Sequence, residues 1–229
     1  MTASSNSNRT HIIEALMRLA AERDWNDFSL SDVAKEAGVP LSDFRDLFPS
    51  KGAILGAFSR QIDQIVLKGH NEDLQDESAK DRLFDVLMRR LDAMRPYRAA
   101  LKGVLQWAKR TPSAAIALNQ VASNSHRFML EAAGISTEGP VGALKIQGLV
   151  IGFTQVVEVW IDDESEDLGA TMAALDKTLD RGGKVIARAE DVQRLTAPLC
   201  NFIGGVMKFG AERRAARKHH TEAEPAGAE

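Results

Sequence analysis

The sequence predicts an all-α protein with nine or ten helices. Apolar residues recur at intervals of three and four along nearly every segment of the 229 residues, and no run alternates like a strand. Glycine and proline fall between these segments, where they end one helix and allow the next to begin. We expect a disordered N-terminus at residues 1–10, a helix-turn-helix head of three or four helices at 11–70, a larger helical body at 80–216 and a disordered tail at 217–229.

The head is predicted from an apolar stripe and three end signals. Ser29 and Asp32 have the spacing of a capping box that opens the short helix in SLSDVAKEAG, and Gly38 ends that helix. Pro40 stands where the next helix begins, and Ser50 suits the N-cap of a long helix from residue 51 to about 70. The acidic stretch NEDLQDESAK then predicts a linker. The stripe of the first helix consists of Ile12, Ile13, Leu16, Leu19 and Ala20.

The body contains six further segments with helical periodicity. Pro96 and Thr111 with Pro112 end two of them, and the adjacent Gly182 and Gly183 are expected to end another. The segment from Val141 to Ile161 is apolar nearly all round, so we expect it at the centre of the body. In order, the segments are residues 83–94, 101–108, 113–134, 141–161, 168–179 and 191–216.

Composition narrows the class of protein. The net charge of −3 gives no overall positive field for nucleic acid, and a single cysteine, Cys200, excludes a disulfide framework and fits a reducing cytosol. The start MTASSNSNRT does not resemble a secretory signal. Lys145 and Glu158 within the most apolar segment favour a buried helix over a membrane span. We therefore expect a cytoplasmic protein.

No pattern of catalytic residues is present. The sequence contains no G-x-S-x-G, no P-loop and no G-x-G-x-x-G, and its histidines lack the spacing of a metal site. These considerations predict a protein that is not an enzyme and that needs no metal or cofactor. The five histidines are His11, His70, His126, His219 and His220.

The turn between the two short helices of the head has a recognisable spacing. Ala34 and Gly38 supply a small residue at the helix crossing and a glycine at the turn, while Phe44 and Phe48 are expected to face inward. From Ile12 to Phe58 the chain resembles the DNA-binding head of the TetR family. The resemblance implies DNA contacts from Ser42, Arg45, Ser50 and Lys51, a body that binds an apolar ligand, and a homodimer. The matching residues are Phe28, Val33, Ala34, Ala37, Gly38, Val39, Phe48, Ser50 and Lys51.

The outward positions of the second short helix depart from that family. Arg45 and Leu47 stand where tyrosines are usual, and Asp43 and Asp46 bring negative charge to the surface that would meet DNA. Residues 1–60 have seven basic against eight acidic side chains, a net charge of −1. Because neutralised phosphates supply most nonspecific affinity for DNA, the head can also be interpreted as a scaffold that keeps the helix-turn-helix shape without reading DNA.

A second resemblance lies in the body, in DESEDLGATMAAL. Its residues Asp163, Ser165, Asp167, Thr171 and Leu175 follow an apolar helix with the spacing D-x-S-x-D-[FL]-x-x-T-x-x-x-L. The spacing is also that of a capped helix start. It resembles the accessory family of coenzyme Q biosynthesis known as Coq nine. That resemblance implies a TetR-like fold that binds a polyisoprenoid lipid and presents it to a ubiquinone-pathway hydroxylase.

Two features are consistent with lipid binding, and each has an alternative. The apolar helix with its glycines can border a ligand pocket, or it can belong to a solid core. The last segment has an apolar face and a basic end, the pattern of a helix on a membrane surface, and it can equally serve as a dimer interface. The pocket residues would be Phe128, Met129, Leu149, Val150, Phe153, Val157 and Trp160. The apolar face of the last segment is Leu199, Phe202, Ile203, Val206 and Phe209.

Two hypotheses about function follow. The first is a non-enzymatic lipid-binding accessory protein of ubiquinone biosynthesis, peripheral on the inner face of the cytoplasmic membrane. The alternative is a dimeric TetR-type repressor that binds DNA and responds to a small apolar ligand.

Overall fold

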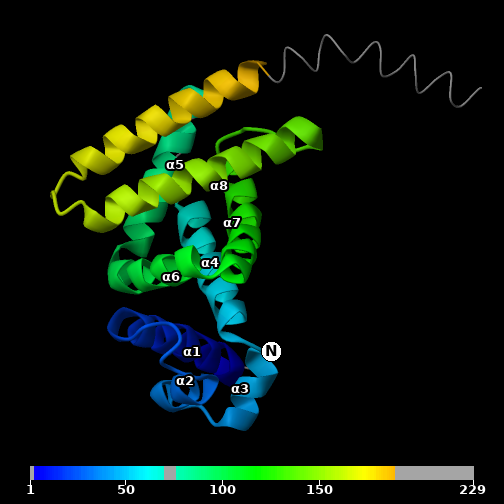
Figure 1. The fold of residues 1–229 in the computed structure, drawn as a ribbon. Coiled ribbons are helices and arrows are strands. Elements are labelled where there is room, and N and C mark those ends of the chain that lie inside the picture. The colour runs from blue at the N-terminus through cyan, green and yellow to red at the C-terminus, as the bar shows by residue number, and fades with distance from the viewer. Residues whose placement is uncertain (1–2, 70–75, 189–229) are drawn as a thin grey trace, which may run out of the picture. The chain divides into compact units, whose positions relative to one another are not determined.

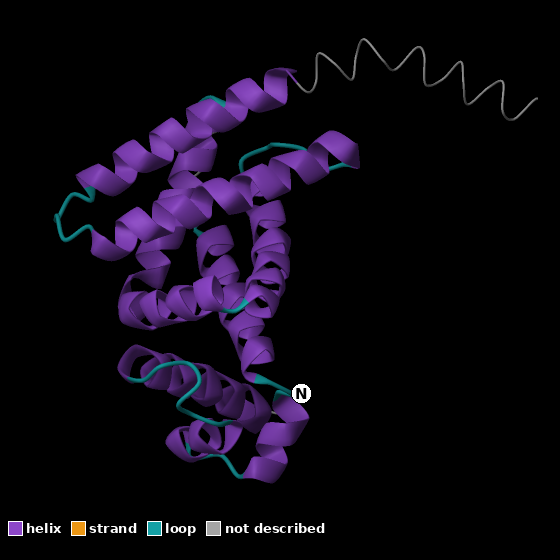
Figure 2. Cartoon of the chain, in the orientation of Figure 1, coloured by secondary structure: helices purple, strands orange, loops and turns teal. Residues whose placement is uncertain are grey.

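A computed structural model describes residues 3–69 and 76–188 of the chain (Figure 1). Over these residues all regular structure is helical, and no strand occurs among them (Figure 2). Eight α-helices have both ends within the described residues, slightly fewer than the nine or ten expected, and helical backbone also runs over 169–188. The predicted all-α class is therefore confirmed.

The N-terminal part contains α1 (Ala3–Glu22), α2 (Leu30–Ala37), α3 (Leu41–Leu47) and α4 (Lys51–Lys68). The end signals of the sequence act as predicted. Ser29 and Asp32 form a complete capping box, Gly38 ends α2 with a left-handed φ of 65°, and the Ser50 hydroxyl accepts a hydrogen bond from the backbone N–H of Ala53. Glycine adopts this φ without the Cβ clash that other residues meet, so the short connection between α2 and α3 requires it.

The first helix begins earlier than expected. Residues 3–10, which the sequence assigns to a disordered N-terminus, are the first turns of α1. The guanidinium of Arg9 lies 4.6 Å from the centre of the Phe48 ring at the end of α3. A cation over an aromatic face is attracted to it, and this tertiary contact favours helix in a polar segment whose own pattern does not predict one.

The rest of the described chain contains α5 (Ala79–Met94), a short 3-10 helix η2 (Arg95–Tyr97), α6 (Arg98–Arg110), α7 (Pro112–Ala132) and α8 (Gly139–Asp162). Pro96 falls in η2 and Pro112 opens α7, so the prolines mark helix ends as predicted. The helix that starts at 169 does not end at Gly182 and Gly183, where the sequence indicates a stop. Neither glycine adopts a left-handed φ, and a glycine within a helix costs only about 1 kcal/mol relative to alanine.

Head and body are packed together. The indole of Trp25, after α1, stacks on that of Trp107 in α6 with 4.7 Å between ring centres. Tyr97 donates a hydrogen bond of 2.8 Å from its hydroxyl to the Glu14 carboxylate. The described residues up to Gly183 form one compact unit. The division that the sequence indicates between residues 70 and 80 is therefore not a boundary between separately packed units.

One helix of the described residues, α8, has the length and composition of a membrane span. A core helix passes the same test, and α8 packs one face on α6 and α7. The buried side chains of that face are Ile146, Leu149, Val150, Phe153, Val156 and Trp160.

The last predicted segment cannot be compared with the structure. Residues 191–216, with Leu199, Phe202, Ile203, Val206 and Phe209, lie outside the described residues, as do Cys200, His219 and His220.

Candidate functional site

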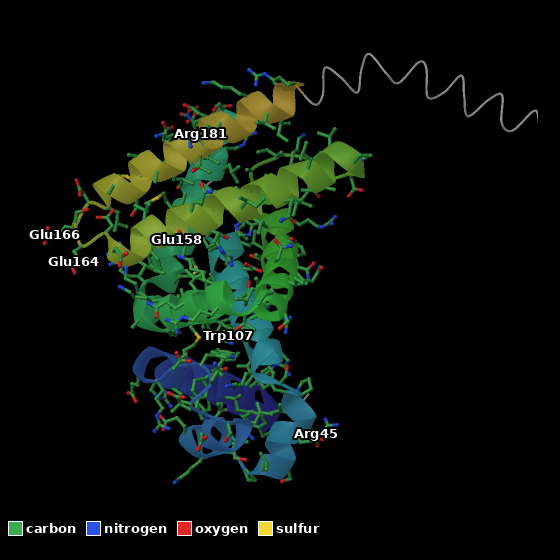
Figure 3. The ribbon with its side chains drawn as sticks, in the orientation of Figure 1. Arg45, Trp107, Glu158, Glu164, Glu166 and Arg181 are labelled. Atoms are coloured by element: carbon green, nitrogen blue, oxygen red, sulfur yellow. The ribbon has the colours of Figure 1, made fainter. Side chains whose placement is uncertain are left out.

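The helix-turn-helix surface is formed by α2 and α3. Phe44 and Phe48 are buried, as their spacing predicts, and they hold α3 against the rest of the head. Ser42, Asp43, Arg45 and Asp46 are exposed on the outer side of α3. The Arg45 side chain points away from the ribbon into solvent (Figure 3), and the Ser42 hydroxyl donates to the Asp43 carboxylate. One basic residue between two aspartates is therefore available to a ligand on this helix.

Lys51 does not point outward as the DNA-contact prediction requires. Its ammonium donates hydrogen bonds to the backbone oxygens of Trp25, at 2.5 Å, and Phe28, at 2.8 Å. The same Nζ lies 4.9 Å and 4.2 Å from the ring centres of these two residues, and burial lowers the pKa of Lys51. The lysine thus ties the loop before α2 to the start of α4. The hydroxyl of Ser50, predicted as another DNA contact, is used as the N-cap of α4.

A cavity of about 490 Å³ lies in the body between α4, α5, α6, α7 and α8. Its volume falls within the range of sites that take drug-sized ligands. Most of its lining is apolar, and it includes side chains of Leu55 and Phe58 from α4. The remaining apolar lining is Met94, Leu101, Val104, Leu105, Ala108, Ala115, Leu118, Val121, Ala122, Val150, Ile151, Phe153 and Val157.

The predicted pocket residues have different locations. Val150, Phe153 and Val157 line the cavity. Met129, Leu149 and Trp160 are buried in the core without lining it. Phe128 is 54% exposed, so its predicted place in the pocket wall is wrong. It lies on the outer face of α7, one residue from the inward Met129, because neighbours in a helix point about 100° apart.

Three helices bring polar groups to the inner wall of the cavity. Asp63 of α4 pairs with Arg90 of α5 and accepts a 2.6 Å hydrogen bond from the Ser125 hydroxyl of α7. Arg90 also contacts the Ser59 hydroxyl at 3.4 Å. The His126 ring packs edge-on against Phe153, 5.0 Å between ring centres. Ser59, Arg90 and His126 line the cavity, and all five polar side chains are buried.

Sequence patterning does not predict this polar group. Asp63 and Arg90 lie in amphipathic helices beside the apolar stripes, and a charged residue at such a place is predicted to be exposed to solvent. The available signal is that each charge falls three or four residues from inward positions: Asp63 from Val66, and Arg90 from Leu87 and Met94. That spacing suggests an inward charge but not its partner.

The motif at residues 163–175 forms a corner between α8 and the next helix. One carboxylate oxygen of Asp163 accepts from the N–H of Ser165, at 3.2 Å, and from its hydroxyl, at 2.5 Å. The other accepts from the N–H and hydroxyl of Thr171, at 2.9 and 2.7 Å. These hydrogen bonds lower the pKa of Asp163, and Leu168 in the same corner has a φ of 52°.

The other motif residues help to hold the same corner together. Thr171 and Leu175 are fully buried, and Asp167 accepts a weaker 3.3 Å bond from the N–H of Gly169. Arg98 of α6 donates to the backbone oxygens of Trp160 and, at 2.7 Å, Asp163. The motif therefore caps and anchors a helix, the role that its spacing also predicts, and none of its residues lines the cavity.

Among the described residues, no cluster of three or more His, Cys, Asp or Glu is arranged to hold a metal ion.

Comparison with known proteins bears on the head and on the fold. Residues 12–58 match the family described as bacterial regulatory proteins, tetR family. No curated protein matches the sequence.

Three solved structures are similar in fold over most of this chain. A TetR transcriptional regulator from Nitrosomonas europaea ATCC 19718 is 23% identical over 76% of this chain and 97% of its own, with a TM-score of 0.60. One from Rhodococcus sp. RHA1 is 20% identical over 78% and 97%, with a TM-score of 0.55. A tetR-family transcriptional regulator from Streptomyces coelicolor is 14% identical over 86% and 98%, with a TM-score of 0.51. The chain therefore has a TetR-family N-terminal domain within a TetR-like all-helical fold.

Proposed function

We propose that the protein is a ligand-responsive transcriptional regulator that binds DNA through α2 and α3. The observation that supports this most is the path of α4. Its first residues, Ser50 and Lys51, follow α3 directly, while Leu55, Phe58 and Ser59 of the same helix line the cavity. A ligand that shifts these side chains moves the helix to which the DNA-binding elements are attached. In this proposal the regulator acts as a homodimer in the cytoplasm.

The proposed contact with DNA depends strongly on Arg45. It is the one basic residue of α3, and Lys51 is turned into the head. An arginine at this place neutralises a phosphate or donates to a guanine. The neighbouring carboxylates of Asp43 and Asp46 repel phosphates, so we expect binding that weakens steeply as salt is raised.

The test starts with selection of genomic fragments by the purified protein, followed by fluorescence polarisation on the selected duplex. A shuffled duplex and a salt series measure specificity. Arg45→Ala is expected to lower affinity about five- to 150-fold, a loss of roughly 1–3 kcal/mol. Arg181→Ala, an exposed arginine on the helix 169–188 (Figure 3), is the matched control and should have no effect. Equal binding of selected and shuffled duplex at about 150 mM salt would refute the regulator proposal.

A second candidate function is the lipid-binding accessory role in ubiquinone biosynthesis. The acidic flank of Arg45 and the inward position of Lys51 favour it, because both reduce the charge available for phosphates. Its partners would be a polyisoprenoid lipid, a pathway hydroxylase and a membrane surface. Mass spectrometry of lipids that copurify with the protein tests it directly. Absence of any isoprenoid, together with no binding to anionic vesicles, would exclude this function.

A further inference from the structure

The inner wall of the cavity holds two polar atoms without a partner. Nε2 of His126 and Nε of Arg90 are fully buried, and neither makes a hydrogen bond within the described chain. The two side chains are 3% and 5% exposed, and both line the cavity. A buried polar atom without a hydrogen bond is costly, so each of these atoms favours a ligand that supplies the missing partner.

The hydrogen-bonding role of each atom follows from its surroundings. Nδ1 of His126 lies 2.8 Å from the backbone oxygen of Ala122, and that oxygen can only accept, so Nδ1 holds the proton. Burial and the nearby Arg90 lower the pKa of His126 to about 3, and the ring is therefore neutral. Its Nε2 is an acceptor. Nε of Arg90, by contrast, is a donor under all conditions.

The charges around these atoms decide the charge of the ligand. The Arg90 guanidinium is already paired with Asp63, whose carboxylate also accepts from Ser125. A carboxylate ligand would meet the lone pair of His126 and the nearby Asp63 charge. An ammonium ligand would meet the Arg90 charge in a buried site. Only an uncharged head avoids both repulsions.

The rest of the cavity sets the body of the ligand. Beyond the polar group the walls are mostly aliphatic and aromatic, supplied by α4, α6, α7 and α8, with the polar side chains of Asn119, Thr154 and Gln155 among them. The other charged lining residues, Lys109 and Glu158, pair with each other at 3.0 Å, and their side chains are 62% and 41% exposed, so they mark the solvent side. A ligand that enters there places its head inward and its chain along the apolar walls.

We propose that the cavity takes an uncharged amphipathic molecule whose hydroxyl head donates to His126 and accepts from Arg90. This inference rests on the proposed function, because it identifies the ligand of the cavity as the effector of the proposed regulator.

The test measures direct binding and needs no DNA. Isothermal titration calorimetry at pH 7.5 compares 1-decanol with decanoate and decylammonium, which have the same chain and charged heads. We expect decanol to bind at least about tenfold more tightly than either, the effect of one or two hydrogen bonds. Tighter binding of a charged probe, or no binding of any alcohol from octanol to dodecanol, overturns the proposal.

A variant tests the histidine itself. His126→Phe keeps an aromatic ring beside Phe153 but removes the acceptor, and it should lower decanol affinity about tenfold. It should not weaken the binding of decanoate, because the lone pair that repels a carboxylate is removed. His11→Phe, an exposed histidine of α1, is the control. If the variant binds decanol as the unmodified protein does, His126 is not the acceptor and the proposal fails. If decanol does not bind as expected but specific DNA binding is intact, only the proposed class of ligand is excluded. If decanol binds but DNA binding is not specific, the regulator proposal is excluded.

Discussion

Replacement of Lys51 by methionine separates a structural role of this lysine from contact with DNA. The structure gives its ammonium two hydrogen bonds, to the backbone oxygens of Trp25 and Phe28, and places it over both rings. Methionine keeps most of the aliphatic stem, so the variant loses the charge and its contacts but little packing. The experiment therefore measures what the ammonium contributes.

The expected loss can be worked from these contacts. A hydrogen bond from a charged donor contributes about 1.5–3 kcal/mol, and a partly exposed site favours the low end for both bonds. Each cation–aromatic contact adds about 0.5 kcal/mol, while water can hydrate the freed oxygens and offset part of the loss. We expect Lys51→Met to lower the free energy of unfolding by about 2–3 kcal/mol. For a chain of this size that corresponds to roughly 4–12 °C in Tm.

Urea unfolding followed by far-UV circular dichroism measures the loss, with an expected shift of the midpoint of about 1 M. Lys35→Met, an exposed lysine of α2, is the control and should stay within about 0.5 kcal/mol of the unmodified protein. The salt dependence of DNA binding should be the same for Lys51→Met and the unmodified protein, measured well below both values of Tm. Unchanged stability together with a salt slope reduced by about one would refute the structural role and restore Lys51 as a phosphate contact.

Three further outcomes are expected. Gly103→Ala brings a Cβ within 2.8 Å of a backbone oxygen of α1 and should destabilise the protein by about 1–3 kcal/mol in urea unfolding. In the control, Gly148→Ala, the added Cβ meets open space and should stabilise the protein by about 0.5–1 kcal/mol. Equal effects of the two substitutions would contradict the close contact between α1 and α6. The pKa of His126 in the folded protein, about 3, lies below its ordinary value near 6.5, so the stability that the neutral ring contributes is complete above pH 6.5 and is lost as pH falls toward 3. His126→Phe should therefore flatten the pH dependence of the free energy of unfolding between pH 3 and 6.5. Parallel curves for the variant and the unmodified protein would argue against a neutral buried ring. Asp163→Asn should lower Tm more than Asp167→Asn, because the first carboxylate accepts four hydrogen bonds and the second one; the reverse order in calorimetry would show that the corner is held in another way.

Local signals in the sequence predicted most helix ends. Ser29, Gly38 and Ser50 act through neighbours within a few residues, so their roles need no knowledge of distant segments. Predictions failed where a distant contact competes with local preference. Residues 3–10 are helical although their pattern is polar, and Gly182 and Gly183 do not end the helix in which they stand. In each case the local preference is about 1 kcal/mol or less per residue, which tertiary packing easily exceeds.

The candidate site was predicted less well than the fold. Of the seven expected pocket residues, Val150, Phe153 and Val157 line the cavity, because the apolar character of α8 is visible in the sequence. Phe128 was assigned inward from its hydrophobicity alone, although its position on α7 faces solvent. Hydrophobicity identifies candidates for burial, but the direction of a side chain depends on the face of the helix from which it projects.

The sequence by itself determined the helical class, the helix-turn-helix and the caps that bound its helices, since these depend on periodicity and on residues close together in the chain. Only the tertiary structure decided that Lys51 turns inward and that Asp63, Arg90, Ser125 and His126 meet at one wall of a cavity. These four residues come from three helices, and their meeting depends on how those helices are rotated against each other. Such rotation follows from the packing of the whole core, to which every buried side chain contributes and no single segment is sufficient.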